Sequence, residues 1–95
     1  MKADLGVRIL LDREREEVER VGYRVEIDLP TAAHRGRATI AREDGEVVFD
    51  GWEPEAPPDW AVKLARAFLR TAWSATRKAD PAPWPRRIVR WRPVP

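Results

Sequence analysis

Arginine and tryptophan occur together, with almost no acidic residues, in residues 60–95 of this 95-residue chain. Residues 60–95 carry nine Lys and Arg residues against one acid, Asp80, a net charge of +8. Residues 1–59 carry nine basic residues against fifteen acidic ones, a net charge of −6, so the total of +2 hides a strong internal asymmetry. Because the arginine guanidinium binds carboxylates and phosphates through paired hydrogen bonds, the basic part predicts an anionic partner.

The first basic group has the spacing of one helix face. Its members lie three, four and seven residues apart, and no acid occurs between Trp60 and Ala79. The group consists of Lys63, Arg66, Arg70 and Arg77. Its side chains are expected to contact phosphates or an acidic protein surface, although the polar side of an amphipathic helix has the same pattern.

The second group interleaves arginine with tryptophan near the C-terminus. It consists of Trp84, Arg86, Arg87, Arg90, Trp91 and Arg92. Here the arginines are expected to bind anions, and a tryptophan to anchor a partner. The alternative is that both tryptophans fill the core, with arginine stems lying along them. The preceding prolines, in residues 80–85, predict a stiff extended connector.

Catalytic chemistry has little support in this sequence. The chain has no Cys, one His (His34) and one Ser, so neither a nucleophile with its base nor a thiolate or histidine metal site is expected. We expect His34 to be a solvated loop residue. The acidic residues are expected to form solvated faces, and they would attract the basic half of a second copy. We therefore predict no enzyme activity, no cofactor, no metal and no small-molecule substrate.

The N-terminal elements are predicted from opposing patterns. Residues 12–21 are rich in helix formers with opposite charges four apart, which predicts a helix that Gly22 ends. The segment before this helix has two interpretations: an earlier start of the same helix, or a short strand over residues 6–11. Residues 23–29 alternate apolar and charged side chains, as a half-buried strand does. Strands over residues 37–42 and 46–50 follow, joined by a turn in which Gly45 takes positive φ, and Val48 is expected to be covered as well as Val47.

The C-terminal elements are a helix and a strand. Asp59 is the expected N-cap of an amphipathic helix over residues 60–78. Residues 86–92 then alternate, with Arg87 and Trp91 on one face and Ile88, Arg90 and Arg92 on the other; prolines predict that this strand lies at a sheet edge. The sequence thus predicts one α+β domain over residues 1–95, ordered α-β-β-β-α-β. A three-stranded antiparallel meander and the C-terminal strand would pack against one long helix, with residues 1–11 uncertain and 93–95 a tail.

The functional prediction is a non-catalytic interaction module. It would dock a protein partner, or its own copies, through the basic helix face and the Arg/Trp-rich C-terminal strand. The alternative is a nucleic-acid-binding protein that uses the same arginines on phosphates. The chain has no Asn or Gln, the usual readers of adenine, so such binding would not depend on sequence. With no apolar run long enough to span a membrane and no signal peptide, a cytoplasmic protein without a membrane partner is expected.

Overall fold

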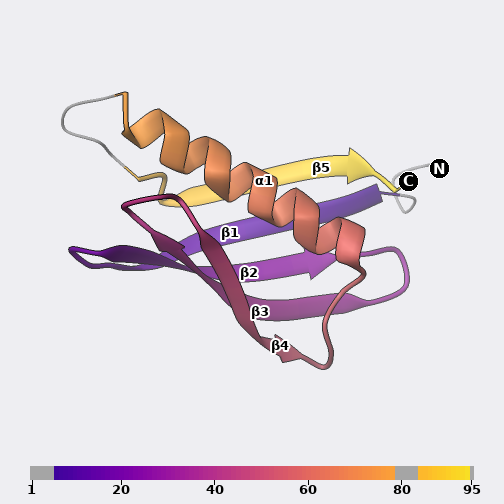
Figure 1. Cartoon of the computed structure of the whole chain (residues 1–95). Helices are drawn as coiled ribbons and strands as arrows, with labels where there is room; N and C mark the ends of the chain where they lie inside the picture. Colours follow the sequence, from indigo (N-terminus) through magenta and orange to yellow (C-terminus); the bar gives the residue numbers. More distant parts are fainter. Residues whose placement is uncertain (1–5, 79–83, 95) are drawn as a thin grey trace.

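The protein, described by a computed structural model over residues 6–78 and 84–94, is a small α+β fold. Within these ranges one sheet holds five antiparallel strands, and one helix follows the fourth (Figure 1). The elements are β1 (Gly6–Glu16), β2 (Arg20–Asp28), β3 (Ala33–Ala41), β4 (Val47–Glu53), α1 (Asp59–Thr76) and β5 (Arg87–Pro93). The strand order is β4-β3-β2-β1-β5, so β5 pairs with β1 and forms one edge.

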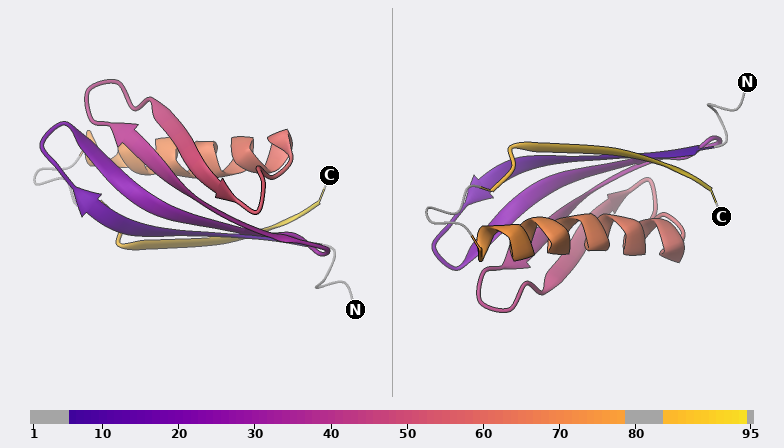
Figure 2. Two further views of the ribbon diagram at one scale, coloured as in Figure 1. Left: turned by 90° about the horizontal axis from the view of Figure 1, so that it is seen from below. Right: turned by 90° about the horizontal axis from the view of Figure 1, so that it is seen from above.

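The helix packs against one face of the sheet. The sheet is strongly twisted, so in the views from below and above β5 and the β3–β4 turn lie on opposite sides of α1 (Figure 2). No other described element covers the opposite face, which we call the open face. Successive strand residues point to opposite faces, so each strand sends alternate side chains toward α1 and toward the open face. The sheet therefore presents two surfaces with different chemistry.

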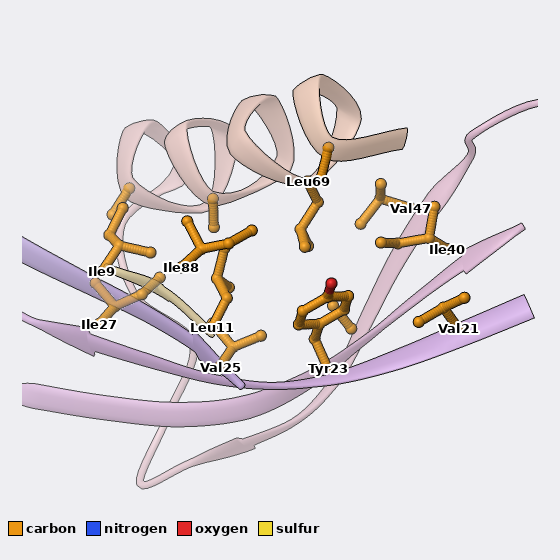
Figure 3. Packing of buried hydrophobic residues seen from close by; sticks show 14 of the residues in the cluster. Ile9, Leu11, Val21, Tyr23, Val25, Ile27, Ile40, Val47, Leu69 and Ile88 are labelled. Atoms are coloured by element: carbon orange, nitrogen blue, oxygen red, sulfur yellow. The ribbon is translucent and has the colours of Figure 1, made fainter. Parts of the chain in front are cut away.

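The core lies between α1 and the sheet face beneath it. Strand β2 contributes four fully buried side chains at alternate positions, Val21, Tyr23, Val25 and Ile27. Leu69 of α1 points down toward them, and Ile88 lies beside Leu11 (Figure 3). Helix residues that contact the sheet closely are small: Ala61, Ala65 and Ala72 are all buried. Because these side chains are small, α1 can pack close to the sheet.

The predicted helix over residues 12–21 is wrong. This segment forms the end of β1, the connection to β2 and the start of β2, and the alternative of a strand beginning at Gly6 is confirmed. Its charged side chains form ion pairs with other parts of the sheet, as in the 3.3 Å pair between Glu16, at the end of β1, and Arg42, just after β3. Ladder pairing and burial of the alternate residues outweigh the few tenths of a kcal/mol expected from each helical charge pair. The order is therefore β-β-β-β-α-β, with four strands before the helix.

Two side-chain predictions in β3 and β4 are also wrong. His34 lies on β3, its side chain is buried, and Nδ1 is 2.8 Å from the Glu55 carbonyl oxygen. It is buried because alternation turns it to the face that α1 and the segment before α1 cover. Val48 is 54% exposed because it points to the open face.

The meander has four strands where three were predicted, because β1 pairs with β2. The pairings predicted within it, the Gly45 turn and the last strand are confirmed, with shifted ends. Strands β2, β3 and β4 pair in sequence, and Gly45 has φ +74° between β3 and β4. Helix α1 begins at Asp59, so Pro58 is the N-cap, and no side chain caps the helix there. It ends at Thr76, two residues before the expected end. Most of the proline-rich connector lies outside the described residues.

Candidate functional site

The basic group on α1 faces β4, at the sheet edge opposite β5. Arg66 lies over the ring of Phe49 in β4, with Cζ 5.3 Å from the ring centroid. Arg70 donates a hydrogen bond to the Gly45 carbonyl at 2.8 Å, and Arg77 donates one to the Glu43 carbonyl at 3.2 Å. Lys63 is exposed. Three of the four side chains thus hold the β3–β4 turn or β4 against the helix.

Trp84 is part of the core. Only 4% of it is exposed, its carbonyl accepts a 2.8 Å hydrogen bond from Arg13 Nη1, and Arg42 lies over its ring. Arg86, two residues later, is exposed, and its carbonyl accepts a hydrogen bond from the Arg13 backbone N–H. Trp84 therefore has no surface to offer a partner, and Trp91 is the tryptophan of this group that remains accessible.

Strand β5 divides its residues between the two faces of the sheet. Arg87 and Trp91 point to the open face, where the Trp91 ring lies against Gly6 and is 49% exposed. Arg90 and Arg92 point to the same side as buried Ile88, toward α1. This division agrees with the alternation in the sequence. The predicted partner-binding arginines consequently occupy three surfaces: the β4 side of the helix, the open face, and the space between α1 and β5.

The open face is close to charge balance because its arginines are interleaved with acids. Arg87 Nε lies 2.7 Å from Asp12 Oδ1, Arg8 Nη2 lies 3.0 Å from Asp28 Oδ2, and Arg37 pairs with Glu14. The hydrogen bond from Arg87 lowers the pKa of Asp12 below its usual value. These pairs are solvent-accessible, so each stabilises the fold only weakly. Paired charges leave little net field on this face to attract an anion.

The groove between α1 and β5 has a different composition. Its helix wall is formed by residues four and eight apart, Trp60, Leu64 and Phe68, all partly buried, and continues along Ala72 and Ala75. Arg90 and Arg92 form the strand wall, and Arg87, whose guanidinium is paired with Asp12, borders one end. No acidic side chain is among the described residues that line it. We call this surface the α1–β5 groove.

The two groove arginines are held in place by short-range contacts. Arg92 Cζ lies 5.1 Å from the centroid of the Phe68 ring, and Nη1 donates a 2.8 Å hydrogen bond to the Trp91 carbonyl. Arg90 Nη1 donates an equivalent 2.8 Å bond to the Val89 carbonyl. Neither guanidinium has a carboxylate partner among the described residues, so both charges are available to an anionic ligand.

The helix wall of the groove was not predicted from the sequence. Leu64 and Phe68 have the spacing of core residues on an amphipathic helix, and Trp60 is the first residue of the expected helix, so their positions in the sequence alone do not indicate a groove. The sequence does contain a signal for this wall, namely the width of the apolar face of the helix. The small residues Ala61, Ala65 and Ala72 fill the centre of that face. The larger residues then lie along one margin of that face, where an edge strand covers them incompletely.

Other features of the described residues assign no further chemistry. No group of three or more His, Asp and Glu side chains is placed to hold a metal ion in the described ranges. No helix within those ranges has the length and apolar character needed to cross a membrane. Comparison with known protein families, curated proteins and solved structures gives no match for this chain.

Proposed function

We propose that this chain is a non-catalytic interaction module that docks an acidic segment of a protein partner in the α1–β5 groove. One observation carries the proposal: the charged side chains among the described residues that line the groove are all arginine, while its helix wall is apolar and aromatic apart from Thr71. A segment that combines carboxylates with apolar side chains complements both walls. Aromatic and arginine residues are also the types that contribute most to binding energy at protein interfaces.

A nucleic acid is the competing ligand for the same arginines. The phosphodiester backbone would satisfy Arg90 and Arg92, and bases stack on aromatic rings. One face of the Phe68 ring already carries Arg92, and the Leu64 side chain offers a base no ring to stack on. The salt dependence of binding separates the two ligands, because each phosphate neutralised releases counterions and steepens the loss of affinity with salt. Binding anchored by apolar contacts loses less affinity over the same range.

The test compares two charge-reversed variants with equal change in net charge. The groove variant is Arg90→Glu/Arg92→Glu, and the matched control is Lys63→Glu/Lys78→Glu, whose lysines are exposed on and just after α1. Binding of a fluorescein-labelled peptide of glutamate and valine, and of a labelled single-stranded oligonucleotide, is followed by anisotropy at two salt concentrations. We expect the groove variant to lose at least about tenfold in peptide affinity and the control to lose less than about twofold.

Three results would count against the proposal. They are equal losses in both variants, absence of peptide binding to the wild type, and tighter binding of the oligonucleotide with a steep salt dependence. Circular dichroism of each variant checks that the fold is retained.

A further inference from the structure

Strand β5 has a free edge whose backbone groups can be assigned from its pairing with β1. The Arg13 N–H bonds to the Arg86 carbonyl, so the even-numbered residues of β5 direct their backbone groups toward β1. In an antiparallel strand the N–H and C=O of one residue point to the same side, and neighbouring residues point to opposite sides. Arg87, Val89 and Trp91 therefore direct their N–H and C=O groups outward.

Two of the outward carbonyls of β5 accept hydrogen bonds from the chain's own arginines. Arg90 Nη1 bonds to the Val89 carbonyl and Arg92 Nη1 to the Trp91 carbonyl, both at 2.8 Å. Pro93, the last residue of β5, has no N–H to offer at this edge. Charged side chains and proline are common means of keeping an edge strand from pairing with another chain. The same two guanidinium groups thus line the groove and protect the edge.

We propose that the acidic partner binds as an added strand, pairing with the free edge of β5 as the sixth strand of the sheet. This inference rests on the proposed function and specifies the conformation and pattern of the partner. Carboxylates of the incoming strand would draw Arg90 and Arg92 away from the two carbonyls, because a charge-assisted bond to a carboxylate is stronger than one to a neutral carbonyl. The released carbonyls and the outward N–H groups then pair with the partner backbone.

The two faces of β5 define the sequence of such a partner. On the helix side the added strand lies beside Arg90 and Arg92, which calls for acidic residues. On the open side it lies beside Val89 and Trp91, which are 43% and 49% exposed, and calls for apolar residues. Cross-strand neighbours contact each other on each face, so the partner is an extended segment in which acidic and apolar residues alternate.

A second copy of this chain is a poor occupant of the same edge. Pairing β5 with β5 would bring four arginines of one copy, Arg86, Arg87, Arg90 and Arg92, against the same four of the other. The alternating segment in this chain, Val25-Glu26-Ile27-Asp28, is paired on both sides within the sheet. The other edge strand, β4, carries Asp50 and Glu53 three residues apart across the irregularity at Gly51, so its acids do not recur at every second residue. A different protein therefore fits this edge better than a second copy.

The test uses two labelled octapeptides of identical composition. One alternates glutamate and valine, and the other groups its glutamates at one end. Amide hydrogen exchange of the whole protein is measured by NMR with and without each peptide. We expect the alternating peptide to bind at least about tenfold more tightly than the grouped one and to slow exchange of the Val89 and Trp91 amides by at least about tenfold.

The variant Val89→Pro tests the edge directly. It removes an outward N–H and leaves the pairing of β5 with β1 intact, since proline is tolerated on an edge strand where the N–H faces solvent. We expect this variant to bind the alternating peptide about tenfold more weakly than the wild type does, while the Trp fluorescence of the free protein stays unchanged.

The outcomes separate this inference from the proposed function. If both peptides bind equally and the Val89 and Trp91 amides exchange as in the free protein, strand addition is refuted and docking in the groove stands. If neither peptide binds, the proposed function is overturned, and the inference with it.

Discussion

Tyr23 is the side chain whose ionisation the fold changes most. It is the only tyrosine in the chain and is fully buried in the centre of β2. Its hydroxyl donates a 2.6 Å hydrogen bond to the Pro85 carbonyl. Burial raises the pKa of Tyr23 to about 12, because a phenolate there would be largely removed from water. The hydroxyl thereby attaches the segment before β5 to the middle of the sheet.

Alkaline pH should unfold the protein through Tyr23. In the unfolded chain this group has an ordinary pKa near 10.0, so the folded state holds the proton more tightly. Stability is therefore complete below about pH 10 and falls as the pH rises from about 10 to about 12, by roughly 2 kcal/mol. Urea denaturation across this range, with tyrosinate absorbance on the same samples, measures both quantities.

The control is Tyr23→Phe. It should cost about 1 kcal/mol at neutral pH, since the Pro85 carbonyl loses its donor, and should remove most of the alkaline loss. A tyrosinate titration of the folded wild type centred near pH 10 would contradict the assignment.

Two glycines with positive φ shape β4 and the turn that precedes it. Gly45, in the turn from β3, has φ +74° and lies against Trp73, whose ring would be 2.5 Å from an added Cβ. Trp73 is fixed in that position by a 2.9 Å hydrogen bond from Nε1 to the Arg42 carbonyl. Gly51, at the irregularity in β4, has φ +69° with no atom within 4 Å of an added Cβ. Backbone strain is common to both sites, whereas the steric contact is confined to Gly45.

Alanine substitution separates backbone strain from crowding in these two glycines. Gly51→Ala should lower the free energy of unfolding by about 1 kcal/mol, the cost of a left-handed conformation for a residue with Cβ. Gly45→Ala should cost about 2–4 kcal/mol, because the Trp73 ring must also move. Urea denaturation of both variants gives the difference. Equal losses would contradict this prediction, because they would show that the Trp73 ring moves away from an added methyl group at Gly45 without a cost in stability.

The sequence predicted the elements whose local pattern agrees with their surroundings. The alternation in β2, the Gly45 turn and the amphipathic α1 are each specified within a few residues, and all are observed. Residues 12–21 failed because helix propensity and charge spacing are local signals, whereas β1 is stabilised by pairing with β2 and β5. His34 was misplaced by the same limitation, since the segment around Glu55 that covers it is distant in the sequence.

At the scale of the whole molecule, the position of β5 beside β1 creates the candidate site. Alternation in the sequence correctly placed Arg90 and Arg92 on the side of Ile88, but it could not say which strand β5 pairs with. The order of strands depends on contacts between residues 6–12 and 87–93. For this reason the helix arginines and the strand arginines, grouped together by charge alone, lie toward opposite edges of the sheet.

Removing the edge arginines should make the protein associate with itself. Arg90→Val/Arg92→Val frees the Val89 and Trp91 carbonyls and halves the number of arginines that repel between copies, so edge-to-edge pairing becomes more favourable. We expect the sedimentation coefficient of this variant to rise with protein concentration, and that of the wild type to stay constant. The control Arg24→Val/Arg35→Val makes the same exchange on the central strands β2 and β3, whose edges are already paired. If the control associates to the same extent, the cause is the added surface hydrophobicity and not the freed edge of β5.

The register that sets Gly6 opposite Pro93 also determines how the sheet responds to force. Tension applied between these two residues acts at the same end of the β1–β5 pair, so it loads the interstrand hydrogen bonds one after another. Such a pair opens like a zipper at low force, whereas strands pulled along their length must break many bonds together. Once β5 is peeled away, Ile88 leaves the core and the outer edge of β1 is uncovered. Tension applied at these two residues therefore detaches first the strand that carries the candidate binding site.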